Sequence, residues 1–129
     1  MKARNRIFFS HVLLAVVFLL VAIASGCQKS GGVKLGVDIP RDVAVTKLAA
    51  VLEDPAAYDG KSIVMKGIVS GQCASFCEFY FSDGPHTVTI FPQGYKFPKL
   101  EKGKSVTVYT RITSGAEQVA VSALGLTMN

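Results

Sequence analysis

The sequence of 129 residues has no tryptophan, three cysteines and only two histidines. His11 belongs to the N-terminal segment, so His86 is the only histidine in the rest of the chain. There is no GxSxG, HExxH or phosphate-binding glycine motif, and no pair of acids has a neighbouring base. We therefore expect a protein that is not an enzyme and has no catalytic residues and no obligatory cofactor.

Acidic residues are absent from the first 26 positions, which contain Lys2, Arg4 and Arg6. This segment therefore supplies most of the formal net charge of +5, because residues 27–129 hold 11 Lys and Arg against 9 Asp and Glu. Nucleic-acid binding draws mainly on clustered Lys and Arg that face phosphate. An excess of only two positive charges over residues 27–129 argues against a nucleic-acid partner.

Residues 1–26 have the three parts of a secretory signal peptide. The positive MKARNR is followed by an uncharged apolar run at 12–24 and by the small residues before Cys27. The apolar run has 13 residues, fewer than the roughly 20 of a membrane-spanning helix. Ala-Ser-Gly-Cys at 24–27 resembles the lipobox of bacterial lipoproteins. The resemblance implies cleavage before Cys27 and attachment of lipid to its sulfur, with fatty acids such as palmitate as the membrane anchor.

Two alternatives to lipidation remain open, and both concern the same segment. Ala22-Ile23-Ala24 is an A-x-A signal, so cleavage after Ala24 would release a soluble protein. An uncleaved segment would instead remain as an anchor.

The segment after Cys27 agrees with a tether. For residues 27–40 we expect a flexible linker, because Cys27 is followed by the polar, glycine-rich QKSGGVKLG. Gln28 stands where lipoproteins retained in the inner membrane of enteric bacteria typically have Asp. By this resemblance, the expected location is the cell envelope, at the periplasmic face of the outer membrane if the host has two membranes.

Residues 41–129 are expected to form one mainly β domain with a short N-terminal helix. Val45, Leu48 and Leu52 recur at helical spacing over 43–55, and Pro55 is expected to end this helix. Alternating hydrophobic residues then predict five strands, at 61–71, 77–84, 86–91, 105–113 and 117–128, with a further short strand at 33–39.

The first long strand is interrupted by Gly67, which predicts a bulge or a sharp coil. Phe79 and Phe81 are expected in the core, with Tyr80 on the opposite face. Five strands of this kind predict a small closed barrel, because closure removes exposed edges. The alternative is an open meander with the helix packed on one face.

Four segments carry a resemblance to a known family: DPAAYDGKSIVMKGIV, CASFCEFYFSDG, GKSVTVYTRI and VAVSALGL. They resemble small exported bacterial OB-fold proteins, many of which are lipoproteins of uncharacterised function. The likeness covers about residues 46–128. It implies a five-stranded OB-like barrel. Relatives often have Gly-Cys-Trp where this chain has Phe76-Cys77-Glu78, so no ligand is implied.

Cys73 and Cys77 lie between the first and second strands of the expected barrel, separated by three residues. In such a hairpin the two residues face each other, with Cβ atoms about 4.5–5.5 Å apart, against about 3.8 Å in a disulfide. Exported cysteine pairs are usually oxidised. We expect a Cys73–Cys77 disulfide that stabilises the hairpin modestly, because a short loop gains little chain entropy.

Two other interpretations of the pair remain open. A strained disulfide is easily reduced, which would make it redox-active, although no Lys, Arg or His in the loop favours a thiolate. Alternatively, Cys73, Cys77 and His86 would bind zinc or copper if the second strand pairs with the third. A structural zinc ion needs a fourth ligand, for which the sequence offers Asp83 or Glu78.

Aromatic residues are the remaining candidates for a ligand site. Tyr80, Phe91 and Tyr109 would line the open face on which OB barrels bind oligonucleotides or sugars. Tyr95 and Phe97 flank prolines in the connection between the third and fourth strands, where we expect them to cap the barrel. For Tyr80, Phe91 and Tyr109, the alternative to a ligand site is burial in the core or in the cap.

Three functional hypotheses follow. The first is a non-enzymatic binding or assembly module, tethered to the membrane, that engages a protein or another envelope component. It would use the Cys73–Cys77 loop together with the Gly94–Lys104 connection. The second is a periplasmic thiol-redox or metal-handling protein that uses Cys73, Cys77 and His86. The third is an OB-type binder of oligosaccharide or nucleic acid.

Overall fold

The strands expected from residue 61 onwards are all present in the computed structural model, which describes residues 32–128. Each begins and ends within two residues of its expected position. The strands are β1 (Val33–Gly36), β2 (Ser62–Gln72), β3 (Phe79–Asp83), β4 (His86–Pro92), β5 (Ser105–Ser114) and β6 (Val119–Met128).

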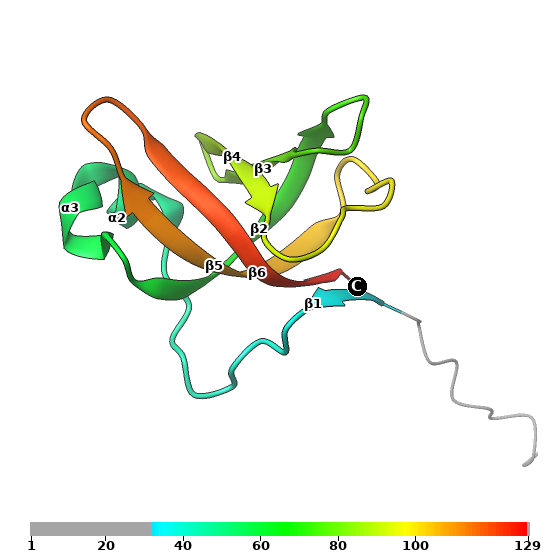
Figure 1. Cartoon of the computed structure of the whole chain (residues 1–129), viewed down its shortest axis with the longest axis horizontal. Helices are drawn as coiled ribbons and strands as arrows, with labels where there is room; N and C mark the ends of the chain where they lie inside the picture. Colours follow the sequence, from blue (N-terminus) through cyan, green and yellow to red (C-terminus); the bar gives the residue numbers. More distant parts are fainter. Residues whose placement is uncertain (1–31, 129) are drawn as a thin grey trace, which may run out of the picture. The chain divides into compact units, whose positions relative to one another are not determined.

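The sheet closes into a barrel of five strands (Figure 1). β2 pairs antiparallel with β3 and with β5, and the pairs β3–β4 and β5–β6 are antiparallel too. A short parallel pairing of β4 with β6, at Ile90↔Val121, completes the circuit. The closed barrel is confirmed, and the alternative of an open meander is excluded.

The sixth strand, β1, pairs antiparallel with the second half of β6, from Val33↔Met128 to Gly36↔Gly125. β4 covers only positions 121–123 of β6, so β1 covers the edge that would otherwise stay open. The short strand expected at 33–39 is therefore present, and 27–40 is not linker throughout. Residues 1–31, with the expected signal peptide and Cys27, lie outside the described residues.

The helix expected over 43–55 is wrong in its limits. Val45 forms a bridge with Val64 of β2, and the Thr46 N–H donates to the Val64 carbonyl at 2.7 Å, so the chain is still extended there. α2 (Leu48–Glu53) starts only after this bridge and buries Leu48 and Val51 in the core. Within residues 32–128, no helix is long and apolar enough to span a membrane.

Pro55 starts a second helix instead of only ending the first. α3 (Pro55–Tyr58) has proline in its first turn, where the missing N–H costs no hydrogen bond. The Asp54 carboxylate accepts the Ala57 N–H at 3.3 Å and caps this helix. Figure 1 shows both helices at one end of the barrel, with the loops at 73–78 and 93–104 toward the other end.

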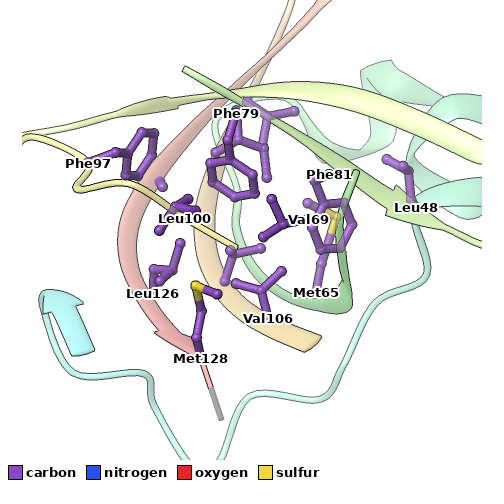
Figure 2. Close-up of a cluster of buried hydrophobic side chains, with 14 of the residues drawn as sticks. Leu48, Met65, Val69, Phe79, Phe81, Phe97, Leu100, Val106, Leu126 and Met128 are labelled. Carbon is purple, nitrogen blue, oxygen red and sulfur yellow. The ribbon is translucent and has the colours of Figure 1, made fainter. Parts of the chain in front are cut away.

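The core lies inside the barrel and uses the inward faces that the alternation predicts. Phe79 and Phe81 of β3 are fully buried. Phe97 from the β4–β5 connection closes the barrel, with its ring edge-on to Phe79 at a centroid distance of 5.1 Å. Figure 2 shows Phe97 and Leu100 in one cluster with Phe79, Val69 and other side chains from the strands. The capping role expected of Phe97 is confirmed.

The bulge in β2 is not at Gly67. Gly67 keeps regular pairing with Val106 of β5, and the register toward β3 shifts at Ser70, between Val69 and Gly71. A Cβ atom at position 67 would overlap the Ser82 carbonyl and the Phe81 ring. Glycine is therefore required there for the close approach of β3 to β2.

Candidate functional site

The loop between β2 and β3 brings the two cysteines into contact. The Sγ atoms of Cys73 and Cys77 are 3.1 Å apart, and both thiols are free. Cys73 N–H donates to the Glu78 carbonyl at 3.1 Å, and Phe76 N–H donates to the Cys73 carbonyl at 2.9 Å. Phe76 adopts the left-handed conformation (φ 58°), which turns the chain back toward β3. The expected juxtaposition is confirmed, while the disulfide itself stays a prediction.

Ser75 lies between the two sulfur atoms. Its Oγ is 3.2 Å from Cys73 Sγ and 3.3 Å from Cys77 Sγ, so its single O–H can donate to either sulfur atom, and it favours whichever of them is a thiolate. Hydrogen bonds from Ser75, and then from Cys77, lower the pKa of Cys73 to about 7, since they stabilise the thiolate. The absence of Lys, Arg and His from the loop did not predict this effect, because a hydroxyl group produces it without a positive charge. A serine between two cysteines was the available signal.

The structure does not bring His86 to the cysteines. His86 pairs with Asp83 at the opposite end of β3 from the loop, so the expected set of Cys73, Cys77 and His86 has no common centre. Glu78 takes the place of His86: its carboxylate and the two Sγ atoms lie within 4.8 Å of one another. These are three donors, one fewer than a structural zinc site needs.

The other candidate fourth ligand, Asp83, is engaged elsewhere. Its Oδ2 accepts the Leu48 N–H at 3.1 Å, and its Oδ1 lies 3.4 Å from Lys47 Nζ. Asp83 therefore serves helix α2, far along β3 from the thiols.

Gln72 joins the cysteine loop to the β4–β5 connection. Its Nε2 donates to the Pro98 carbonyl and its Oε1 accepts the Leu100 N–H, both at 2.8 Å. Because Gln72 directly precedes Cys73, the two segments expected to share a surface, 73–77 and 94–104, are held side by side. Figure 1 shows them as the neighbouring green and yellow loops.

Two exposed aromatic rings lie on the outer face of β3 and β4. Tyr80 is 38% exposed and Phe91 is 43% exposed. Tyr80 pairs with Thr89, and Phe91 lies two positions further along β4, so both side chains point outward on neighbouring strands. The Tyr80 ring lies over Gly71 of β2, where a Cβ atom would come within 2.9 Å of it.

The same outer face is polar but uncharged around these rings. Ser82 and Thr87, opposite each other on β3 and β4, bring their hydroxyl oxygens to 2.7 Å. No Lys or Arg occurs between residues 79 and 92. The part of the face formed by β3, β4 and their turn therefore combines flat aromatic surface with hydroxyl groups and has no Lys or Arg of its own.

Tyr109 does not belong to this face. It pairs with Val64 of β2, whereas Tyr80 pairs with Gly71, seven residues further along the same strand. At about 3.3 Å per residue, this separation is roughly 20 Å. Tyr109 is also only partly exposed. The expected ligand-binding set of Tyr80, Phe91 and Tyr109 is thus reduced to its first two members.

A shallow hollow of about 210 Å³ lies where β1 enters the barrel, between the start of that strand and the β4–β5 connection. It is lined by Gly32, Val33, Lys99, Leu100, Glu101, Lys104 and Met128. Pockets that enclose a drug-sized ligand usually measure about 300–1,000 Å³. The hollow is therefore a weaker candidate site than the outer face of β3 and β4.

No family model matches the sequence, and no curated protein matches it significantly. Among solved structures, the hypothetical protein ygiW from E. coli aligns with a TM-score of 0.56 at 10% identity, over 74% of this chain and 100% of that one. The chain is an OB-like barrel. A putative aspartyl-tRNA synthetase from Leishmania major Friedlin also aligns, with a TM-score of 0.56 at 10% identity, over 73% of this chain. The match spans only 22% of the synthetase, and at these identities both structures show the fold alone.

Proposed function

We propose that this protein is a bacterial lipoprotein, tethered through Cys27, whose OB-like barrel binds a neutral envelope polysaccharide across the outer face of β3 and β4. The observation that carries the proposal is the pair of exposed rings, Tyr80 and Phe91, on neighbouring strands. In OB barrels the face of the second and third strands is the usual place for oligosaccharides and oligonucleotides. Counted within the barrel, β3 and β4 are these strands.

The chemistry of the face favours sugar over nucleic acid. The C–H edges of a pyranose ring carry partial positive charge and pack against the negative face of an aromatic ring. Hydroxyl groups such as those of Ser82 and Thr87 exchange hydrogen bonds with sugar hydroxyls. A nucleic acid would need Lys or Arg opposite its phosphates, and β3, β4 and their turn have none.

Binding is tested with β-1,4-linked N-acetylglucosamine oligomers and with isolated peptidoglycan, by calorimetry and by co-sedimentation. Tyr80→Thr and Phe91→Thr remove one ring each and keep a side chain that suits a strand. Each is expected to weaken binding about tenfold, or about 1.4 kcal/mol. Val45→Thr is the matched control, because Val45 is equally exposed and lies outside this face. Equal binding by all three variants would refute the site.

The tether is tested separately. Intact mass of the protein purified from cell membranes should show a lipid-modified N-terminal cysteine and loss of residues 1–26. Cys27→Ser should abolish the modification and shift the protein out of the membrane fraction. If the substituted protein still fractionates with the membrane, an uncleaved N-terminal anchor is the better interpretation.

A further inference from the structure

The cysteine loop is already shaped for disulfide formation while both thiols are free. The two Sγ atoms are 3.1 Å apart, and a disulfide measures about 2.05 Å, so closure requires a movement of about 1 Å. The backbone hydrogen bonds from Cys73 to Glu78 and from Phe76 to Cys73 hold the loop in this form. Reduction and oxidation therefore leave the loop in nearly the same conformation.

The hairpin is held by contacts other than the disulfide. β2 and β3 are paired from Ile68↔Ser82 to Gln72↔Phe79, and Phe79 is fully buried directly after the loop. A bond that closes a loop of three residues removes little entropy from the unfolded chain. A disulfide whose formation changes neither the fold nor much of its stability is suited to repeated opening and closing.

We propose that Cys73 and Cys77 form a reversible dithiol–disulfide pair that exchanges two electrons with a partner protein bearing two neighbouring thiols. The contact between the two sulfur atoms in an exposed loop carries this assignment. It is independent of the polysaccharide site, because it involves neither Tyr80 nor Phe91.

The two cysteines have different roles in the exchange. Cys77 is exposed and follows Phe76, whose ring is 41% exposed and provides an apolar contact for a partner. Cys73 is half-buried, and once it carries the negative charge the Ser75 hydroxyl, whose Oγ lies 3.2 Å away, can donate to its thiolate and stabilise it. A thiol of lower pKa is the better leaving group. Attack therefore occurs at Cys77 Sγ, and Cys73 leaves.

The exchange balances as two successive substitutions. A thiolate of the partner attacks Cys77 Sγ, the Cys77–Cys73 bond breaks, and the electron pair stays on Cys73 as a thiolate. The second partner thiolate then attacks the partner sulfur of this mixed disulfide and releases Cys77. Two electrons and two protons have moved to Cys73 and Cys77, and the partner holds the new disulfide. The reverse sequence reoxidises the pair.

The first test uses the full-length protein in detergent, equilibrated with mixtures of reduced and oxidised glutathione. After alkylation, the tryptic peptide 67–96 contains Cys73 and Cys77 without Cys27, so its mass reports this pair alone. We expect the pair to pass from disulfide to dithiol within the range that glutathione covers. A pair that stays oxidised in a large excess of reduced glutathione would be a permanent staple and would overturn the proposal.

The same samples show which cysteine is attacked and whether the pair is a metal site instead. Acid quenching during reduction should trap glutathione on Cys77, and trapping on Cys73 would refute the assigned roles. Zinc added to the reduced protein should be lost again on dialysis, because three donors are one fewer than a structural zinc site needs. Zinc that stays bound at one ion per chain after dialysis would show a metal site in place of the redox pair.

The second test changes Ser75→Ala, with Ser70→Ala as the matched control. Ser70 lies on the same hairpin, but its hydroxyl donates to the Tyr80 carbonyl. In the reduced wild type, alkylation of Cys73 should show a midpoint near pH 7, in keeping with its lowered pKa of about 7. Ser75→Ala should raise this midpoint and slow opening by glutathione several-fold at pH 7, without changing the melting temperature. Equal behaviour of both variants would overturn the role of Ser75.

Discussion

The Asp83 carboxylate caps helix α2 across 35 positions of sequence, because its Oδ2 accepts the Leu48 backbone N–H at 3.1 Å. The residue at the N-cap position, Lys47, provides no side-chain cap of its own. The Lys47 ammonium lies 3.4 Å from the other oxygen of Asp83. The β3–β4 hairpin thereby fixes the start of the helix and keeps Leu48 in the core.

Removing this carboxylate should destabilise the fold. Asp83→Ala is expected to lower the free energy of unfolding by about 1 kcal/mol, as other helix caps do. Asp83→Asn keeps an acceptor oxygen and should lose less. Urea unfolding followed by circular dichroism measures both. Asp38→Ala is the control, because Asp38 makes only an exposed ion pair with Lys34 and should give no measurable change. Equal stability of Asp83→Ala and wild type would contradict the cap.

The Gln72 amide is expected to hold the β4–β5 connection in place. Gln72→Ala removes two hydrogen bonds to the backbone and should cost about 1–3 kcal/mol of stability. The amide of Leu100 should exchange with solvent faster in hydrogen-exchange mass spectrometry. Gln93→Ala provides the comparison, since Gln93 is an exposed glutamine of the same connection. If the two variants exchange alike, the connection is held by the packing of Phe97 instead.

Gly67 should tolerate no side chain. Gly67→Ala places a methyl group against the Ser82 carbonyl and the Phe81 ring, and we expect a loss of about 1–3 kcal/mol, as for other overpacked cores. Gly71→Ala is the matched change in the same strand. Its new methyl group meets only the Tyr80 ring, which is exposed and can move. A larger loss for position 71 than for position 67 in thermal unfolding would contradict this explanation.

The barrel was predictable because each strand buries every second residue. Phe79 and Phe81 alternate with Tyr80, and this period of two gave both the strand and its inward face. The start of helix α2 was not predictable from its own residues. Its cap, Asp83, lies in another element, and Val45 belongs to a bridge with β2 despite its helical spacing.

The candidate site could be predicted only in part, because some of its contacts are local and others depend on how the strands pair. The contact between Cys73 and Cys77 follows from local hairpin geometry, which the spacing alone specifies. The separation of His86 from the cysteines follows from chain order once the strand is accepted, because the loop precedes β3, His86 follows it, and a strand of five residues separates its two ends by about 17 Å. The distance between Tyr109 and Tyr80 could not be predicted, because it depends on the register between strands, which only the closed barrel fixes.

Tyr95 should make the stability of the barrel fall at alkaline pH. Its ring packs edge-on to Phe97 at 5.6 Å, and within the described residues its hydroxyl is buried without a hydrogen-bond partner. Burial raises the pKa of Tyr95 to about 12, because it disfavours the phenolate. The unfolded chain, with a pKa of about 10, loses this proton first. Stability that is present below pH 10 is therefore lost between about pH 10 and pH 12.

The Tyr95→Phe variant removes both the titration and the unpaired hydroxyl. At pH 7 we expect it to be as stable as wild type or more stable by about 1 kcal/mol, because a buried hydroxyl without a partner costs free energy. Between pH 10 and pH 12 its advantage in urea unfolding should grow. Tyr80→Phe is the control, because its exposed ring should follow the wild type. If the advantage of Tyr95→Phe stays constant over this range, or if it is less stable at pH 7, the hydroxyl has a hydrogen-bond partner or access to water.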